Sequence, residues 1–357
     1  MSAVVSSLLG AFDAEIASMH IIDGMLDLRV AAAAGVFGSA GLLVGLRRLD
    51  RRLGERTTVL MGTMSAFVFA AQMVNFPIGP LPISGHLLGG VLAAVMLGPW
   101  AGAVVIAAVL IVQCFLFGDG GLTALGANFI NMGLIGAVAG YAIYAPIRRA
   151  IGGRRGVLIG GMVAAWFSVL LAAGAFTIEL AASGRRADFF NVLGLMALVH
   201  SAIGLGEALI TGLVLRFILR ARPDLVYEAD REGDEMPPSN AQHWGQVVFA
   251  GLGIALAMAV VLAPFASSRP DGLEYVGARL GFLPKSHPLL AAPIPDYELT
   301  AFGSGHLKIA TALAGMVGTV VVFGLGVGLA RTFPGKDAGA VECRIADGMA
   351  PPPRHSS

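Results

Sequence analysis

Charged residues are scarce in this chain of 357 residues: they make up 13% of it, against 56% hydrophobic residues and a mean hydropathy of +0.77. The apolar residues come in long blocks, which excludes an ordinary water-soluble domain and indicates an all-α polytopic membrane protein. The formal net charge of +1 gives no basic excess for binding nucleic acid. Two cysteines, Cys114 and Cys343, are too few for a disulfide framework.

The chain also lacks the motifs of two enzyme classes. It contains no G-x-x-x-x-G-K-[ST] loop for ATP phosphates and no H-E-x-x-H zinc pattern. The stretch Gly118-Asp119-Gly120-Gly121 resembles a phosphate loop only in its glycines, so we expect a tight turn with Asp119 capping the next helix. These absences argue against an enzyme.

A spanning helix needs roughly twenty mainly apolar residues. On that rule we count about nine segments: Leu28–Leu46, Thr57–Phe76, His86–Leu97, Trp100–Phe117, Leu122–Ala145, Val157–Ala182, Phe190–Leu219, Gln246–Ala266 and Leu307–Ala330. The third is short and is followed by Gly98-Pro99. It is either a half-span that continues into the next helix or a re-entrant piece.

Basic residues follow the odd-numbered segments, and the positive-inside rule makes that side cytoplasmic. We therefore predict a multi-pass protein of the inner (plasma) membrane, with the N-terminus outside and the C-terminus inside. Arg185 and Arg186 are the one exception. The residues that set this orientation are Arg47, Arg48, Arg51, Arg52, Arg56, Arg148, Arg149, Arg154, Arg155, Arg216, Arg220, Arg222, Arg331 and Lys336.

Composition divides the chain into five parts. The first part carries Asp13 and Glu15 and no basic residue, which makes a poor signal peptide and favours Met19 as the initiator. The parts are an N-terminal extension (1–18), a seven-segment block (19–222), a charged linker (223–243), a hairpin of two spans around a long external loop (244–331) and a polar tail predicted to be disordered (332–357).

The stretch Met19-His20-Ile21-Ile22-Asp23-Gly24 reads like the first residues of a chain. A chain that begins Met-His offers a metal ion the terminal amine, the His amide nitrogen and the imidazole in succession. Such a nitrogen set suits the tetragonal ions Ni(II) and Cu(II). If residues 1–18 stay attached, the amine becomes an amide and that chelate is lost.

His86, in Ser84-Gly85-His86, opens the third segment. A neutral imidazole at a membrane boundary can ligate a borderline metal, and the alternative is a histidine bonded to the backbone of a turn. Because the topology places His20 and His86 on the same face, we favour ligation. Ser84 is expected to cap the helix or to orient the ring, and Asn75 lies in the preceding loop.

Polar residues inside the apolar segments are further candidates. His200 and Glu207 lie seven residues apart on one helical face, with Glu179 as another partner; they suggest a second metal station, a proton-coupled pair or a contact that locks helices. Asn128 and Asn131 either line a polar path or form hydrogen bonds between helices.

Together these stretches resemble the membrane substrate-capture subunit of energy-coupling-factor (ECF) transporters for nickel and cobalt, over residues 19–220. The distal hairpin resembles the small accessory subunit of those systems, and its Pro270-Asp271-Gly272-Leu273-Glu274 is similar to the nickel-type version, which favours nickel. The matching stretches are Met19–Gly24, Ala66–Pro77, Ser84–Gly90, Leu97–Trp100 and Phe117–Asn128.

The resemblance implies a compact bundle of seven helices that holds Ni(II) or Co(II), as transported substrate, near the external surface. The implied ligands are the Met19 amine, the His20 backbone and side-chain nitrogens and the His86 ring. The implied partners are a separate cytoplasmic ATPase and a transmembrane coupling subunit, with no resident cofactor in this chain. Asn75, Ser84, Asp119, Asn128, His200 and Glu207 are candidates for the surroundings of the ion or its path.

One alternative function keeps transport but removes the ATPase. A proton-coupled divalent metal permease would use His200, Glu207 and Glu179 as its proton relay. A membrane enzyme or metal sensor ranks last, because the chain shows no nucleophile–base pair.

Overall fold

The computed structural model describes residues 20–49, 54–184, 188–227, 244–284, 288–298 and 307–332. Within them, seven helical stretches are long and apolar enough to cross a membrane, which confirms the all-α polytopic prediction: Leu28–Arg48, Pro99–Phe117, Leu125–Ile151, Gly153–Ala182, Phe189–Ala221, Gly245–Phe265 and Lys308–Arg331. Several residues and segments singled out from the sequence lie outside the described ranges: the N-terminal extension, most of the linker, most of the polar tail, Met19, Arg51, Arg52, Arg185, Arg186, Lys336 and Cys343.

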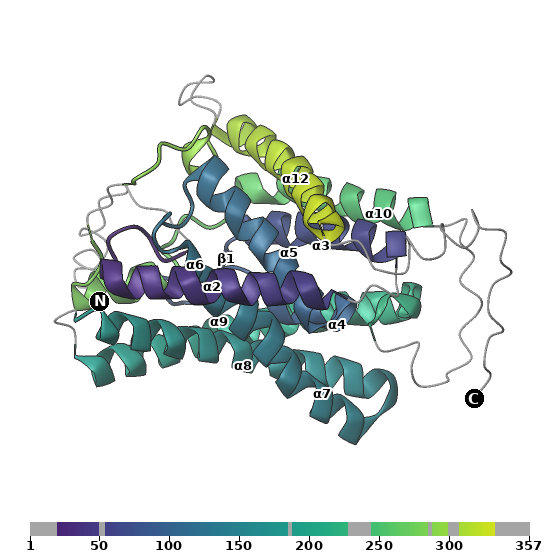
Figure 1. Cartoon of the computed structure of the whole chain (residues 1–357), viewed down its shortest axis with the longest axis horizontal. Helices are drawn as coiled ribbons and strands as arrows, with labels where there is room; N and C mark the ends of the chain where they lie inside the picture. The colour runs from purple at the N-terminus through teal and green to yellow at the C-terminus, as the bar shows by residue number, and fades with distance from the viewer. Residues whose placement is uncertain are drawn as a thin grey trace, which may run out of the picture.

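The seven-segment block is a bundle of helices that lie roughly along one direction in Figure 1. Its helices are α2 (Leu28–Arg48), α3 (Gly54–Gln72), α4 (Gly90–Leu97), α5 (Pro99–Val112), α6 (Leu125–Asn128), α7 (Gly140–Ile151), α8 (Gly153–Ala182) and α9 (Phe189–Ala221). Two π-helical stretches, η2 (Gln113–Phe117) and η3 (Phe129–Ala139), continue α5 and join α6 to α7. A short 3-10 helix, η4 (Pro223–Leu225), follows α9.

Glycines bring the helices close together. A methyl group added at Gly126 in α6 would lie 2.5 Å from Gly35 Cα in α2, so only hydrogen fits between the two backbones. Membrane bundles use small residues in this way because lipid gives helices no hydrophobic reason to associate, and dispersion contacts must hold them together.

The third segment differs from the helix expected to begin at His86. Two short strands, β1 (Phe76–Pro77) and β2 (Ser84–Gly85), form an antiparallel hairpin, and the chain stays non-helical until α4 begins at Gly90. Residues 86–89 have no regular secondary structure, and Gly89 adopts a left-handed conformation just before α4. The far end, Gly98, contacts the Tyr227 ring beyond α9, so this segment crosses the bundle and is not re-entrant.

The C-terminal hairpin packs against α3. It consists of α10 (Trp244–Ala257), which continues into η7 (Met258–Leu262) and η8 (Ala263–Phe265), and of α12 (Leu307–Arg331). Its connecting segment contains α11 (Gly272–Leu280), which packs on α9, and η9 (Pro295–Tyr297). We call this segment, residues 266–298 as described, the accessory loop. In Figure 1 α12 lies across α3 and α5.

The bundle has two distinguishable ends. The arginines of the described residues that were used to predict orientation end α2, α7, α9 and α12 or begin α8. His20 and the accessory loop lie at the opposite end, where α2 begins. We refer to these as the arginine end and the histidine end.

Candidate metal centre

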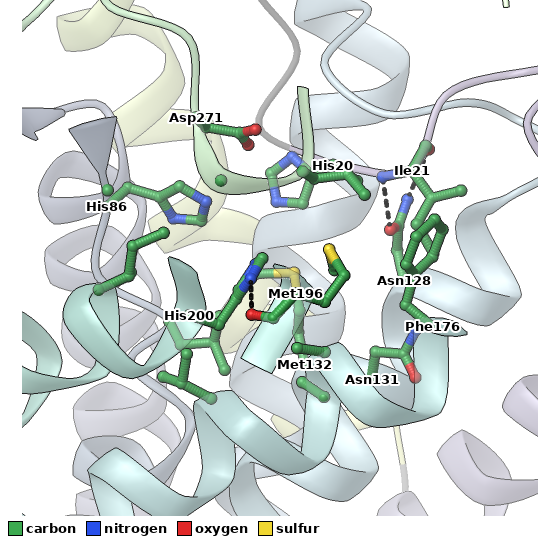
Figure 2. Close-up of a pocket in the computed structure, with 18 residues that line it drawn as sticks. His20, Ile21, His86, Asn128, Asn131, Met132, Phe176, Met196, His200 and Asp271 are labelled. Carbon is green, nitrogen blue, oxygen red and sulfur yellow. Dashed lines mark hydrogen bonds between the residues drawn. The ribbon is translucent and has the colours of Figure 1, made fainter. Parts of the chain in front are cut away.

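A small cavity at the histidine end, of about 90 Å³, brings together three imidazoles from distant parts of the sequence. Figure 2 shows that these rings and two thioether side chains point into it. Its wall comes from the segment before α2, the segment before α4, the helices α6, η3, α8 and α9, and the accessory loop. The polar or sulfur-containing residues that line it are His20, His86, Asn128, Asn131, Met132, Met196, His200 and Asp271.

His20 is held by its neighbours on the turn that follows η2. The Asn128 side chain accepts a hydrogen bond from the Ile21 N–H and donates one to the Ile21 carbonyl, both at 3.0 Å. Gly121 also donates its N–H to the Ile21 carbonyl. Two residues further along, Asp23 accepts hydrogen bonds from the backbone and hydroxyl of Thr123. Asn128 therefore fixes the backbone beside His20, a role more specific than lining a path.

Asp119 does not cap a helix, contrary to the expectation from the sequence. Its Oδ1 lies 2.9 Å from His20 Nδ1, and its Oδ2 accepts a 2.7 Å hydrogen bond from the hydroxyl of Tyr297 in the accessory loop. The helix that follows, α6, begins after Ala124 without a side-chain cap. Because a carboxylate only accepts, Nδ1 of the neutral His20 ring carries the proton, and Nε2 carries the lone pair.

His86 lies in the non-helical stretch before α4. Buried side chains form the hydrogen bonds that the backbone N–H and C=O groups of this stretch need. The Glu207 carboxylate accepts hydrogen bonds from the N–H groups of Leu88 (2.6 Å) and Gly89 (2.9 Å), while Gln72 donates to the Leu88 carbonyl. Non-helical backbone at membrane depth needs such partners, because no water is available there. The His86 ring centroid lies 5.8 Å from that of His20, so the structure brings the two predicted ligands together.

Ser84 and Asn75 connect to the accessory loop and not to a metal-facing ring. The Ser84 hydroxyl donates to the Arg269 carbonyl at 2.7 Å, and the Ser84 N–H donates to the carbonyl of Pro270. The Asn75 carbonyl accepts from the Ser267 N–H. The prediction that Ser84 caps the helix or orients the ring was wrong, because β2 lies beside the accessory loop.

The three groups proposed as a proton relay are bonded to different partners. His200 Nδ1 donates to the Met196 carbonyl at 2.9 Å, and Glu179 accepts from the Asn131 side chain at 2.9 Å. Glu207 holds the backbone before α4 and does not line the cavity, whereas His200 does. The geometry therefore gives no direct His200–Glu207 contact to support a relay.

Sequence reasoning missed the accessory loop's own contribution to the cavity. Asp271 caps α11 in a reciprocal pair with Glu274, remains 5% exposed and lines the pocket beside His20. Burial raises the pKa of Asp271 to about 6, although the Glu274 N–H and the attraction of His20 act in the opposite direction. The motif Pro270–Glu274 was the available signal, but a motif does not say what its loop touches.

In the part of the chain that the structure describes, His, Cys, Asp and Glu side chains by themselves do not complete a metal site. Among the described residues, no group of three His, Cys, Asp or Glu side chains is placed to hold a metal ion. His20 and His86 supply two imidazoles, so a site built on them needs other donors, such as main-chain nitrogens or thioethers. Met19, the predicted source of the amine, lies outside the described residues.

The apolar spans define the chain as a polytopic helical membrane protein, and a small cavity lined by imidazoles lies at one end of its bundle. Residues 20–225 match the family model described as the cobalt uptake substrate-specific transmembrane region, and residues 245–334 match the PDGLE domain. The chain belongs to this family of cobalt uptake membrane components, with a PDGLE domain in the same polypeptide.

Relatives of known description share this architecture. A protein of Archaeoglobus fulgidus, provisionally named as the fused nickel transport protein NikMN, is 36% identical over 88% of this chain and 98% of its own length. The fused nickel transport protein NikMN of Rhodobacter capsulatus is 31% identical over 87% and 98%, and the cobalt transport protein CbiM of Geobacter sulfurreducens is 28% identical over 84% and 89%. The crystal structure of a truncated transition metal transporter, 30% identical, superposes with a TM-score of 0.51 over 57% of this chain and 99% of that one.

Proposed function

We propose that this chain is the metal-capturing membrane component of an ATP-driven ECF transporter that imports Ni(II) or Co(II), with nickel favoured. The observation that carries the proposal is the pairing of His20 and His86, whose rings lie 5.8 Å apart at a buried cavity. They come from two motifs far apart in the sequence, in a chain of a cobalt uptake family.

The proposed ligands are the Met19 amine, the His20 amide nitrogen, the His20 ring and the His86 ring. A chelate through the amide and the ring of one histidine closes a six-membered ring only through Nδ1. In the structure that nitrogen bonds Asp119, so loading the cage requires the His20 ring to turn and release this hydrogen bond. If the amine is blocked by an attached extension, His20 instead presents Nε2 as a single donor.

The donor chemistry supports selectivity for a first-row transition ion. Imidazole and amine nitrogens suit Ni(II), Co(II) and Cu(II), whereas Mg(II) and Ca(II) prefer oxygen ligands. The one carboxylate that lines the cavity among the described residues is Asp271, and it is engaged in capping α11. Cu(II) would bind such a cage at least as well, so its exclusion depends on metal availability.

Nickel is favoured over cobalt on two grounds. The accessory loop carries the Pro270–Glu274 motif of the nickel-type version, and two fused relatives are named for nickel transport. The relative named for cobalt transport also matches most of this chain, at 28% identity. Competition between Ni(II) and Co(II) for the purified chain distinguishes the two directly.

Transport needs partners that this chain does not provide. The chain contains no P-loop, so we propose a separate cytoplasmic ATPase joined through a transmembrane coupling subunit. The arginine-rich ends of α2, α7 and α9 support a cytoplasmic location for the arginine end, which places the metal cavity outside. No observation favours the competing permease, because its proposed relay residues bond different partners. These residues are His200, Glu207 and Glu179.

The test is Ni(II) titration of the detergent-solubilised full chain and its His20→Ala and His86→Ala variants. We expect both to lose stoichiometric capture while keeping the wild-type melting temperature. His355→Ala, which removes a histidine from the C-terminal tail, is the matched control and should bind normally. Wild-type Ni(II) affinity in His86→Ala would overturn the site.

The state of the N-terminus decides the donor set. Intact mass of the chain purified from its membrane gives the first residue, and a chain that begins at Met19 supports the four-nitrogen cage. A chain that keeps residues 1–18 and still binds Ni(II) would remove the amine from the site. Uptake that persists without any ATPase but collapses with an uncoupler would favour the permease instead.

A further inference from the structure

The cavity has a second group of potential metal donors that the proposed cage does not use. His200 and Met196 lie on α9, and Met132 lies on η3. All three line the same cavity as His20 and His86, and Figure 2 shows their side chains pointing into it. The proposed cage donors come from non-helical segments, whereas these three come from membrane-spanning helices.

The hydrogen bond of His200 determines which nitrogen is available. Its Nδ1 lies 2.9 Å from the Met196 carbonyl, which only accepts, so Nδ1 carries the proton. The Nε2 of the neutral ring then carries a lone pair. The neighbouring Cε1 lies 3.0 Å from the position of a methyl group added at Gly272. This part of the ring therefore faces the accessory loop at the cavity wall.

Two thioethers accompany this imidazole. Met196 is 2% exposed and Met132 is 6% exposed, so both sulfur atoms are placed in the protein interior and not toward lipid. Thioether and imidazole donors bind borderline and soft transition ions and have little affinity for Mg(II) or Ca(II). Methionine also fills gaps in cores for packing alone, and the experiment below distinguishes the two roles.

Met132 lies in an irregular stretch of helix. The segment Phe129–Ala139 is π-helical over 11 residues, and π-helical turns are rare and concentrate at functional sites. The residue before it, Asn131, is fixed by its hydrogen bond to Glu179 of α8. The wider π turn thus presents Met132 at the cavity while Asn131 anchors the helix to α8.

We propose that His200, Met196 and Met132 form a second metal station, which receives the ion when the segment that carries His20 releases it. The inference rests on the proposed capture function and adds the next step of the ion's route. His86 lines the same cavity and stays bound during the exchange. The Nε2 of His200 and the thioethers of Met196 and Met132 replace the Met19 amine and the two His20 nitrogens, the His20 amide regains a proton from water, and the oxidation state of the metal is unchanged.

Such a station addresses a physical difficulty of tight capture. A nitrogen cage that binds strongly releases its ion slowly, and stepwise replacement of ligands avoids passing through a fully unligated ion. The segment that carries His20 is joined to the accessory loop through the contact of Asp23 with Leu289 and that of Asp119 with Tyr297. Movement of that loop can therefore withdraw one donor set while the helix-borne set remains.

The first experiment separates capture from transport. His200→Gln and Met196→Leu keep side-chain volume and remove the imidazole and the thioether. We expect the purified full chain to retain stoichiometric capture of Ni(II), while Ni(II) uptake by cells that express the complete transporter falls by about tenfold or more. Met162→Leu, which removes a thioether on α8 outside the cavity, is the matched control.

Each other outcome has a definite meaning. Wild-type uptake in both His200→Gln and Met196→Leu would overturn the station. Loss of Ni(II) capture in His200→Gln, to the extent expected for His86→Ala, would also overturn it, because His200 would then belong to the primary cage. Failure of the proposed function itself is distinguishable, since it appears as unchanged capture in His86→Ala.

A spectroscopic experiment tests whether the ion reaches α9 at all. In a His20→Ala background, His200→Cys places a thiolate at the station, and Co(II) bound there acquires a sulfur-to-metal charge-transfer band. The His20→Ala parent, which keeps both native cysteines, gives the baseline. Appearance of the band at excess Co(II) supports the station, and its absence at excess Co(II), whether or not the double variant binds the ion elsewhere, contradicts it.

Discussion

Tyr297 donates a 2.7 Å hydrogen bond to Asp119, the same carboxylate that lies 2.9 Å from the ring of His20. Tyr297 belongs to the accessory loop and His20 to the segment before α2. The Tyr297 ring also stacks on Phe117, with centroids 4.4 Å apart. One buried carboxylate thus connects the C-terminal hairpin to a proposed metal ligand at the other end of the chain.

Removing the Tyr297 hydroxyl should weaken metal binding without unfolding the bundle. Tyr297→Phe keeps the stack on Phe117 and leaves Asp119 with one fewer donor, so the carboxylate bonds the Nδ1–H of His20 more strongly and opposes the turn of the ring that loading requires. We expect the Kd for Ni(II) to rise by about tenfold.

Tyr275→Phe is the control for this change, because the Tyr275 hydroxyl bonds only the exposed Arg279 among the described contacts. Calorimetric titration of both variants gives the comparison. Equal affinities of Tyr297→Phe and wild type would show that the Tyr297 hydroxyl does not affect the release of His20 by Asp119.

The charge of Asp271 should add to metal affinity above about pH 6. Its pKa is raised from 3.8 to about 6, so the carboxyl is neutral below that pH and negative above it. Asp271→Asn keeps an amide oxygen to cap α11 and removes the charge. We expect weaker Ni(II) binding than wild type at pH 7.5 and a smaller difference at pH 5.5.

The same shift has a consequence for the metal-free protein. Because the folded-state pKa is raised, Asp271 destabilises the fold as pH rises through about 6, and this effect is absent below about pH 4. Asp271→Asn should therefore melt at a higher temperature than wild type at pH 7.5. A pH-independent difference in both affinity and melting temperature would contradict the role of the charge.

A methyl group at Gly126 should separate α2 from α6. Gly126→Ala places a Cβ 2.5 Å from the Gly35 Cα, a backbone atom that moves only with its helix. We expect a loss of about 1–3 kcal/mol in unfolding free energy. Gly174→Ala in α8 is the control, because nothing lies within 4 Å of its added methyl group. Equal stability of the two variants would show that α2 shifts freely.

The orientation in the membrane can be tested with single cysteines. In a Cys114→Ala, Cys343→Ser background, Leu289→Cys lies at the histidine end and Ile151→Cys at the arginine end, both at exposed positions. A membrane-impermeant maleimide applied to intact cells should label position 289 and not position 151. The reverse pattern would invert the proposed topology.

Much of the fold is readable from the lengths of the apolar runs. The segments predicted at Val157–Ala182 and Phe190–Leu219 agree closely with α8 and α9, because a spanning helix must satisfy its own backbone in lipid. The same rule failed at His86, where residues 86–89 have no regular secondary structure. There Glu207 and Gln72 supply the hydrogen bonds that the backbone would make internally in a helix. A local sequence pattern cannot predict these partners, because they lie far away in the sequence.

The candidate metal site was likewise predictable from the sequence only in part. The count of apolar segments and the positive-inside rule were sufficient to predict that His20 and His86 share a face, and the structure places their rings side by side. Ser84 and Asp119 were assigned to helix caps because local sequence is all that such a prediction can use. Both instead bond the accessory loop, with Arg269 and Tyr297 as partners.

The sequence by itself determined that this chain is a helical membrane protein, where most of its spans lie, and which two histidines are candidates to bind a metal. Those properties follow from hydropathy and short motifs, which act within one segment. Only the tertiary structure decided that Asp271, His200, Met196 and Met132 share one cavity with them. The physical reason is that helix packing, set by glycine contacts and long-range hydrogen bonds, chooses which segments become neighbours.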